Sequence, residues 1–154
     1  TIPRKNTGSS ITTRDTRRNM KMFRAFCKED DGWFFYVKVY PSKKLMQAGL
    51  RRAFLSAKCD AMCADHIHQT WDGKRMKTEL DIGCLYFHHD SMRVGVICHE
   101  AFHAAIAWHR LTREVKVLKL SRERGGNVGK HEEDVAWVAG NIARQIVLNY
   151  KRKK

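Results

Sequence analysis

VICHEAFHAAIAW, residues 96–108, is the stretch that decides the expected fold, because it combines a buried helix with reactive side chains. It contains His99-Glu100-Ala101-Phe102-His103, the H-E-x-x-H pattern. On an α-helix the two histidines lie four positions apart and project from one face, where both can bind a single Zn²⁺. Glu100 is then positioned to act on a metal-bound water. Apolar and small residues flank the pattern, which predicts a helix at the centre of a small domain.

A hydrolytic zinc site needs three protein ligands and one open position for water. The third ligand has to come from another element, and the start of the last predicted helix offers Glu133. Glu132 is the alternative, and His131 is a weaker third choice. Ala136 and Gly140 follow Glu133 along one stripe of small residues, which would let this helix approach the motif helix closely. Alternatively, the acidic residues only complement the positive end of their own helix.

Two segments, HEAFHAA at 99–105 and EDVAWVAG at 133–140, resemble the gluzincin metallopeptidases. The short spacing is similar to that of the minigluzincins, which include ImmA/IrrE-like proteins and small phage-encoded peptidases. The resemblance covers about residues 80 to 150 and implies an α+β, zincin-like fold with a short mixed sheet packed on the H-E-x-x-H helix. It also implies a zinc-dependent peptidase, with His99, His103 and Glu133 as ligands and Glu100 as the general base.

The resemblance further implies an edge strand that aligns the substrate backbone just before the motif helix; the matching stretch is Gly83 to Phe87. Trp137 stands where some larger gluzincins have an aspartate that supports a ligand histidine. The sequence does not choose between several side chains that could contact the substrate or the transition state, namely Tyr86, His109, His131 and Arg144.

Hydrophobic periodicity and turn residues predict the remaining elements. Strands are expected at 33–40, 66–71, 80–87 and 114–120, with a turn at 71–74 and a loop at 124–129. Helices are expected at 42–58, at 91–109 with Ser91 as the N-cap, and at 131–150. This order favours an α+β class.

The chain carries a formal net charge of +14, which indicates attraction to nucleic acid or another polyanion. Residues 1–28 hold eight basic side chains and one acidic one, and they predict a basic arm that becomes helical from about Thr16 to Cys27. Residues 29–150 form the predicted zincin-like domain, and 151–154 a basic tail. The arm and the tail either contact phosphates or only keep the protein in solution. The candidate nucleic-acid contacts are Arg14, Arg17, Arg18, Lys21, Arg24, Lys151, Arg152, Lys153 and Lys154.

The five cysteines form an odd set, which predicts reduced thiols and a cytoplasmic location. A phage protein in the infected cell or associated with the virion fits this expectation. No apolar run approaches the roughly 18 residues needed to span a bilayer. The expected partner is a polypeptide substrate. The second hypothesis is a non-catalytic, zinc-stabilised protein that binds nucleic acid or belongs to a virion.

Overall fold

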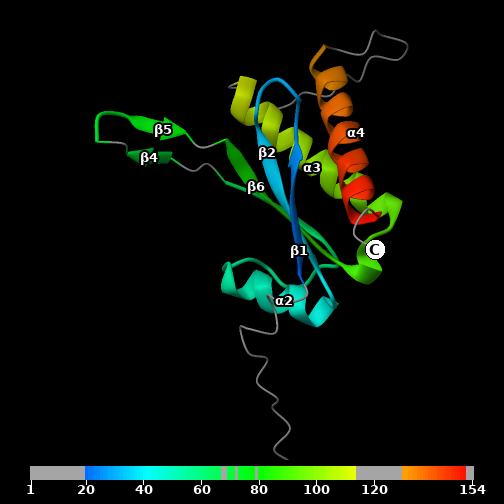
Figure 1. Ribbon diagram of the computed structural model, residues 1–154. Coiled ribbons are helices and arrows are strands. Elements are labelled where there is room, and N and C mark those ends of the chain that lie inside the picture. The colour runs from blue at the N-terminus through cyan, green and yellow to red at the C-terminus, as the bar shows by residue number, and fades with distance from the viewer. Residues whose placement is uncertain (1–19, 67–68, 72, 79, 114–129, 152–154) are drawn as a thin grey trace, which may run out of the picture.

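The computed structural model describes residues 20–66, 69–71, 73–78, 80–113 and 130–151, and it shows an α+β fold (Figure 1). A small mixed sheet of four strands packs against helices, and a separate two-stranded hairpin extends from the sheet. The elements in chain order are β1 (Lys21–Phe26), β2 (Phe34–Tyr40), α2 (Lys43–Arg52), β3 (Met62–Asp65), β4 (Gln69–Trp71), β5 (Met76–Thr78), β6 (Asp81–His88), η1 (His89–Ser91), α3 (Val94–Arg113) and α4 (Lys130–Lys151).

The strand order is β1-β2-β6-β3, which places β6 inside the sheet. Strand β6 pairs in parallel with β2 and antiparallel with β3, while β1 pairs antiparallel with β2. Residues 82 to 88 of β6 are all buried, as expected for a strand with neighbours on both sides and cover on both faces. β3 is therefore an edge strand.

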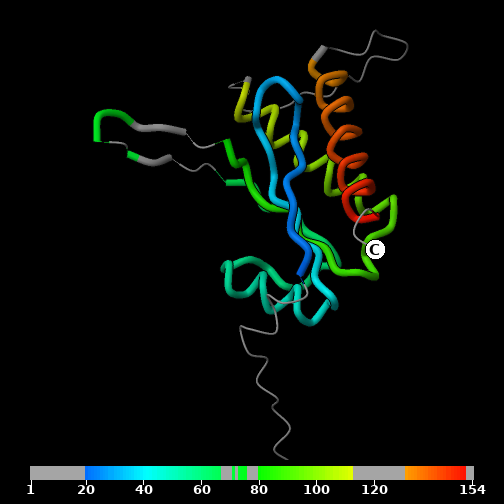
Figure 2. Tube along the Cα trace, in the orientation of Figure 1, coloured from blue at the N-terminus to red at the C-terminus, as the bar shows by residue number. Residues whose placement is uncertain are grey.

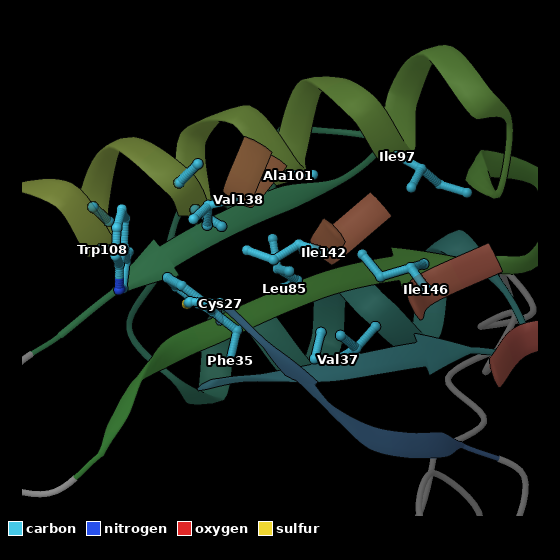
Figure 3. Close-up of a cluster of buried hydrophobic side chains, with 14 of the residues drawn as sticks. Cys27, Phe35, Val37, Leu85, Ile97, Ala101, Trp108, Val138, Ile142 and Ile146 are labelled. Atoms are coloured by element: carbon cyan, nitrogen blue, oxygen red, sulfur yellow. The ribbon is translucent and has the colours of Figure 1, made fainter. Parts of the chain in front are cut away.

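Helices α3 and α4 lie side by side on one face of the sheet (Figure 2). They run antiparallel, because His109 contacts His131 at one end and His89 contacts Tyr150 at the other. The main core fills the space between these helices and the sheet (Figure 3). Burial of each large apolar side chain stabilises the fold by about 1.5–3 kcal/mol. The side chains that line this core include Phe35, Val37, Leu85, Ile97, Ala101, Trp108, Val138, Ile142 and Ile146.

A second, smaller core lies on the opposite face of the sheet. Because side chains alternate along a strand, Leu85 and Phe87 enter the main core while Cys84 and Tyr86 enter this second one. Helix α2 covers it with Met46 and Leu50.

The expected strand at 33–40 and the expected helices around the motif and at 131–150 are confirmed. The helix expected up to Cys27 is wrong, because Lys21–Phe26 forms strand β1 of the sheet. The folded part therefore begins before residue 29. Of the strand expected at 66–71, Gln69–Trp71 forms β4, which pairs with β5 in a hairpin, and His66 N–H donates to the Ile82 carbonyl of β6 at 2.7 Å. The elements expected at 114–120 and 124–129 lie outside the described residues.

Helix α2 ends at Arg52, six residues earlier than the expected end at residue 58. Phe54 has φ +58°, and Leu55 N–H donates to the Leu50 carbonyl at 2.9 Å. This is the hydrogen-bond pattern of a Schellman C-cap, in which glycine usually occupies the left-handed position. Ser91 is also not the cap of α3: its hydroxyl hydrogen-bonds the backbone of His88.

Within the described ranges, no helix combines the length and apolar character needed to cross a membrane.

Candidate metal and catalytic site

His99 and His103 lie one turn apart on the exposed side of α3, with their Nε2 atoms 3.1 Å apart. Their rings are close to perpendicular, at 78°. Two nitrogens bound to one tetrahedral zinc at 2.0–2.1 Å are separated by about 3.3 Å. The histidine pair therefore fits two positions of a zinc site with almost no movement.

Glu100, the next residue after His99, is only 7% exposed. It lines a cleft of about 490 Å³ between α3 and the edge strand β3, which His103 also lines. No hydrogen bond occupies its carboxylate within the described part of the chain. Glu100 is thus held beside the histidine pair with its carboxylate available to a molecule in the cleft. The other lining residues are Ala61, Met62, Cys63, Asp65, Ile106, Ala107 and Arg110.

The strand beside this cleft is β3, so the expectation that Gly83 to Phe87 forms the substrate-aligning edge is wrong. Those residues belong to β6, whose backbone is already paired with β2 and β3. Strand β3 pairs on one side only among the described strands. Its other side can accept an extended peptide, because an edge strand exposes backbone donors and acceptors.

Cys63 also lines the cleft, but its chemistry is that of a buried thiol. Burial raises the pKa of Cys63 well above its usual value, and the nearby carboxylates of Asp65 and Glu100 raise it further. The thiol therefore stays protonated at neutral pH, and only a thiolate is a strong nucleophile. Glu100 and His103 are left as the candidate reactive groups of the cleft.

The structure does not bring the predicted third ligand to the histidine pair. Glu133 is exposed and Glu132 half-buried in the first turn of α4, where His131 Nδ1 lies 3.0 Å from His109 Nε2. His109 follows His103 by six residues, which is about 9 Å along the helix axis at 1.5 Å per residue. The start of α4, which contacts His109, is therefore separated from the histidine pair. Among the described residues, no three His, Cys, Asp or Glu side chains are grouped so that they could hold a metal ion. Glu133, with Glu132 as its alternative, stays a prediction.

The small stripe on α4 does not face α3 as expected. Ala136 and Gly140 are both exposed, and the helix packs through Val138, Ile142 and Ile146 instead. The side of α4 that carries Glu133 is therefore turned toward solvent.

The residues that were candidates for contacts with the substrate or the transition state lie in different parts of the molecule. Tyr86, one of the candidate contacts, packs in the second core, on the face of the sheet away from α3. Arg144 lines a separate cavity of about 360 Å³ beside Phe26 and α4. His109 is fully buried against His131. Arg110, which the sequence did not single out, lines the cleft instead; its position seven residues after His103 puts both on one face of the helix.

The nucleic-acid candidates fall in different places. Lys21 and Arg24 belong to strand β1, and Lys151 is the last residue of α4. Arg14, Arg17, Arg18 and 152–154 lie outside the described residues.

Neither protein-family models, nor curated proteins, nor solved structures give a match to this chain. The argument for a site therefore rests on the geometry of α3, β3 and the cleft between them.

Proposed function

We propose that this chain is a zinc-dependent peptidase. His99 and His103 are two of the ligands, Glu133 or alternatively Glu132 is the third, and Glu100 is the general base. The observation that carries the proposal is the pair of Nε2 atoms 3.1 Å apart beside a buried glutamate that opens into a cleft.

In this proposal the two histidines of α3 bind the metal and Glu100 transfers protons. A zinc ion held by the pair would lower the pKa of its bound water and polarise the substrate carbonyl. Glu100 accepts the proton as the water attacks and then passes it to the leaving amine, a transfer that contributes about 10²- to 10⁴-fold to the rate. Its burial keeps the carboxylate fixed between α3 and β3 during both transfers.

Strand β3 orients the substrate. An extended peptide pairs with its free edge and thereby places a peptide bond over Glu100 and His103, which line the same cleft. Arg110, further along α3, offers guanidinium donors to substrate carbonyl groups. This arrangement favours an unfolded segment or a loop of a protein as the substrate.

Metal analysis combined with a cleavage assay tests the proposal. The wild type is expected to bind about one equivalent of zinc and to cleave members of a peptide mixture followed by mass spectrometry. His99→Ala should lose both properties. Glu100→Gln should keep the zinc and lose cleavage by about 10²-fold or more. The exposed Glu29, which lies at the separate cavity, provides the control Glu29→Gln. A wild type without zinc, or full activity in Glu100→Gln, would refute the proposal.

The third ligand has its own test. Glu133→Ala is expected to weaken zinc binding strongly in a chelator competition, while Glu132→Ala has little effect. The reverse result would assign Glu132. Unchanged affinity in both variants would mean that neither residue binds the metal.

The alternative function is a non-catalytic zinc protein that binds nucleic acid or belongs to a virion. The charge of +14 favours it. It predicts zinc binding without cleavage of any peptide by the wild type. For the location, the free thiols of the five cysteines fit a reducing compartment, so we place the protein in the cytoplasm, including that of a phage-infected cell.

A further inference from the structure

The sheet face turned away from α3 and α4 carries aromatic and basic side chains in alternation. Three cross-strand pairs of β1 and β2 lie on it: Met22 with Lys38, Arg24 with Tyr36, and Phe26 with Phe34. The residues between them, Phe23, Ala25, Phe35 and Val37, pack in or against the main core, as the alternation of a strand requires. We call Arg24, Phe26, Phe34, Tyr36 and Lys38 the aromatic face.

The side chains of the aromatic face form a cluster of ring–ring and cation–ring contacts. The rings of Phe26 and Phe34 are 5.8 Å apart, and those of Phe34 and Tyr36 are 5.2 Å apart and edge to face. The Arg24 guanidinium lies 4.6 Å from the centroid of Phe34 and 5.8 Å from that of Tyr36. Lys38 lies over the neighbouring Tyr86 at 5.3 Å. Cation–ring contacts therefore extend over three strands, β1, β2 and β6.

The aromatic face is only partly covered by other residues that the structure describes. Helix α2 packs on the same side, against Tyr40 and Tyr86 at the far end of β2 and β6. Arg24 is exposed, and Met22 and Phe26 keep 49% and 38% of their surface open. No carboxylate of the described residues forms an ion pair with Arg24. Phe34, Tyr36 and Lys38 are half-buried, and Tyr36 packs against the second core. A half-exposed aromatic cluster with unneutralised cations is a surface that suits a flat, anionic partner.

We infer that the aromatic face binds single-stranded nucleic acid, with bases stacked on Phe26, Phe34 and Tyr36 and phosphates contacting Arg24 and Lys38. Bases stack on aromatic rings and on guanidinium planes, and the basic side chains follow the backbone. In a duplex the base faces are already stacked on one another, so a single strand fits this surface better. The net charge of +14 adds attraction to the phosphates. This inference does not depend on the proposed peptidase activity.

Fluorescence anisotropy with labelled 12-nucleotide oligothymidine and oligouridine tests the inference with the full-length protein. We expect both single strands, or one of them, to bind more tightly than a duplex of the same length. Arg24→Ala and Tyr36→Leu should each weaken binding by about 5- to 100-fold, because a stacked base contributes that range. Tyr36→Leu keeps an apolar side chain and removes only the ring, so a loss there reports stacking.

Matched controls lie elsewhere on the surface. Phe54→Ala removes an aromatic ring that is 98% exposed at the end of α2, and Arg93→Ala removes an exposed cation next to α3. Neither should change affinity by more than about twofold, since stacking accounts for the larger losses on the aromatic face. His99→Ala should also bind normally, which separates this surface from the zinc site.

Three results would overturn the inference: equal affinity for the duplex, unchanged affinity in both Arg24→Ala and Tyr36→Leu, or tighter binding of an oligoglutamate peptide than of the oligonucleotides. The last would assign the face to acidic protein segments. Arg24 is exposed, so its variant gives an answer even if Tyr36→Leu proves unstable in a circular dichroism melt.

Discussion

Phe54 shows how one side chain can be held in a conformation that its chemistry disfavours. Its φ of +58° places it in the left-handed region, although its ring is 98% exposed and makes no compensating burial. A left-handed residue with a Cβ costs about 1–2 kcal/mol. Phe54→Gly should therefore raise the free energy of unfolding in urea by about 1 kcal/mol. Phe54→Ala, which keeps a Cβ, should leave it nearly unchanged, and equal effects of the two substitutions would contradict this explanation.

His88 should make stability depend on pH. It is 5% exposed, and burial lowers its pKa, an effect that the carboxylates of Asp90 and Asp60 partly offset. Because the folded-state pKa is below the unfolded one, protons bind more tightly to the unfolded chain. The stability contribution is complete above about pH 7 and decreases as the pH falls through 6.5 toward the lower folded-state pKa.

Urea unfolding of the wild type and of His88→Gln between pH 7.5 and 5.5 measures this effect. The wild type should lose more stability than the variant over that interval, because only the wild type has an imidazole to protonate at this position. Parallel pH profiles would contradict the assignment. His89→Gln, at the exposed neighbour, serves as the control.

For single residues, the sequence predicted how the side chains of α3 are placed but not which side chains of β3 line the cleft. Two histidines at helical spacing are adjacent in any helix, so His99, His103 and Glu100 could be inferred from local geometry alone. Cys63 and Asp65 reach the cleft through pairing between β3 and β6. Pairing between strands distant in the chain has no local signal, which is why the sequence could not show it.

Among the elements, β1 illustrates how tertiary pairing overrides a local pattern. Phe23 and Ala25 point inward and Met22 and Arg24 outward, which is the period of a strand. A helix was expected from about Thr16 to Cys27, and only the pairing with strand β2 decides between helix and strand. The strand expected at 80–87 is confirmed as β6, but it was expected at the edge of the sheet and lies inside it. Its internal place in the sheet depended on β3, which has only four residues.

At Gly83 of β6 the backbone of β3 leaves no room for a side chain. A Cβ at this residue would overlap the backbone carbonyl oxygen of Ala64 on β3, and backbone atoms cannot rotate away. Gly83→Ala should therefore lower the free energy of unfolding by about 1–3 kcal/mol, as overpacking does. Because the substitution displaces β3, it should also weaken any activity that uses the cleft.

Gly140→Ala is the matched control for Gly83→Ala. A Cβ there meets nothing within 4 Å on the exposed side of α4. Alanine in a helix is more stable than glycine by about 0.5–1 kcal/mol, so this variant should be stabilised in the same urea titration. A stable Gly83→Ala protein would show that β3 and β6 are not packed as described.

On the scale of the whole molecule, the sheet separates two surfaces. The histidine pair and its cleft lie on the side of α3, and the aromatic face lies on the other side. A protein bound at the cleft and a strand of nucleic acid on the aromatic face would not compete for space. The sequence could not predict this division, because Arg24 was assigned to an arm and not to a strand. It also could not place Glu133 relative to α3, since the packing of two helices depends on all their buried contacts.

The basic residues before the sheet should change how strongly nucleic-acid binding depends on salt. Replacing Arg14, Arg17 and Arg18 together by alanine removes three positive charges. If all three contact phosphates, the slope of log affinity against log salt concentration should become shallower by about 2, at roughly 0.7 per contact for a single strand. The preference for single strands over duplexes should stay, because it belongs to the aromatic face. An unchanged slope would mean that these arginines do not contact phosphates.

The length of β3 also bears on aggregation. A free sheet edge is a template on which another chain can add strands, and long flat edges promote assembly without limit. Strand β3 has four residues and ends at the charged Asp65. It is long enough to hold a few residues of a guest peptide, yet too short to nucleate a growing intermolecular sheet. The same strand therefore allows the molecule to capture extended polypeptide while it remains a poor seed for its own self-association.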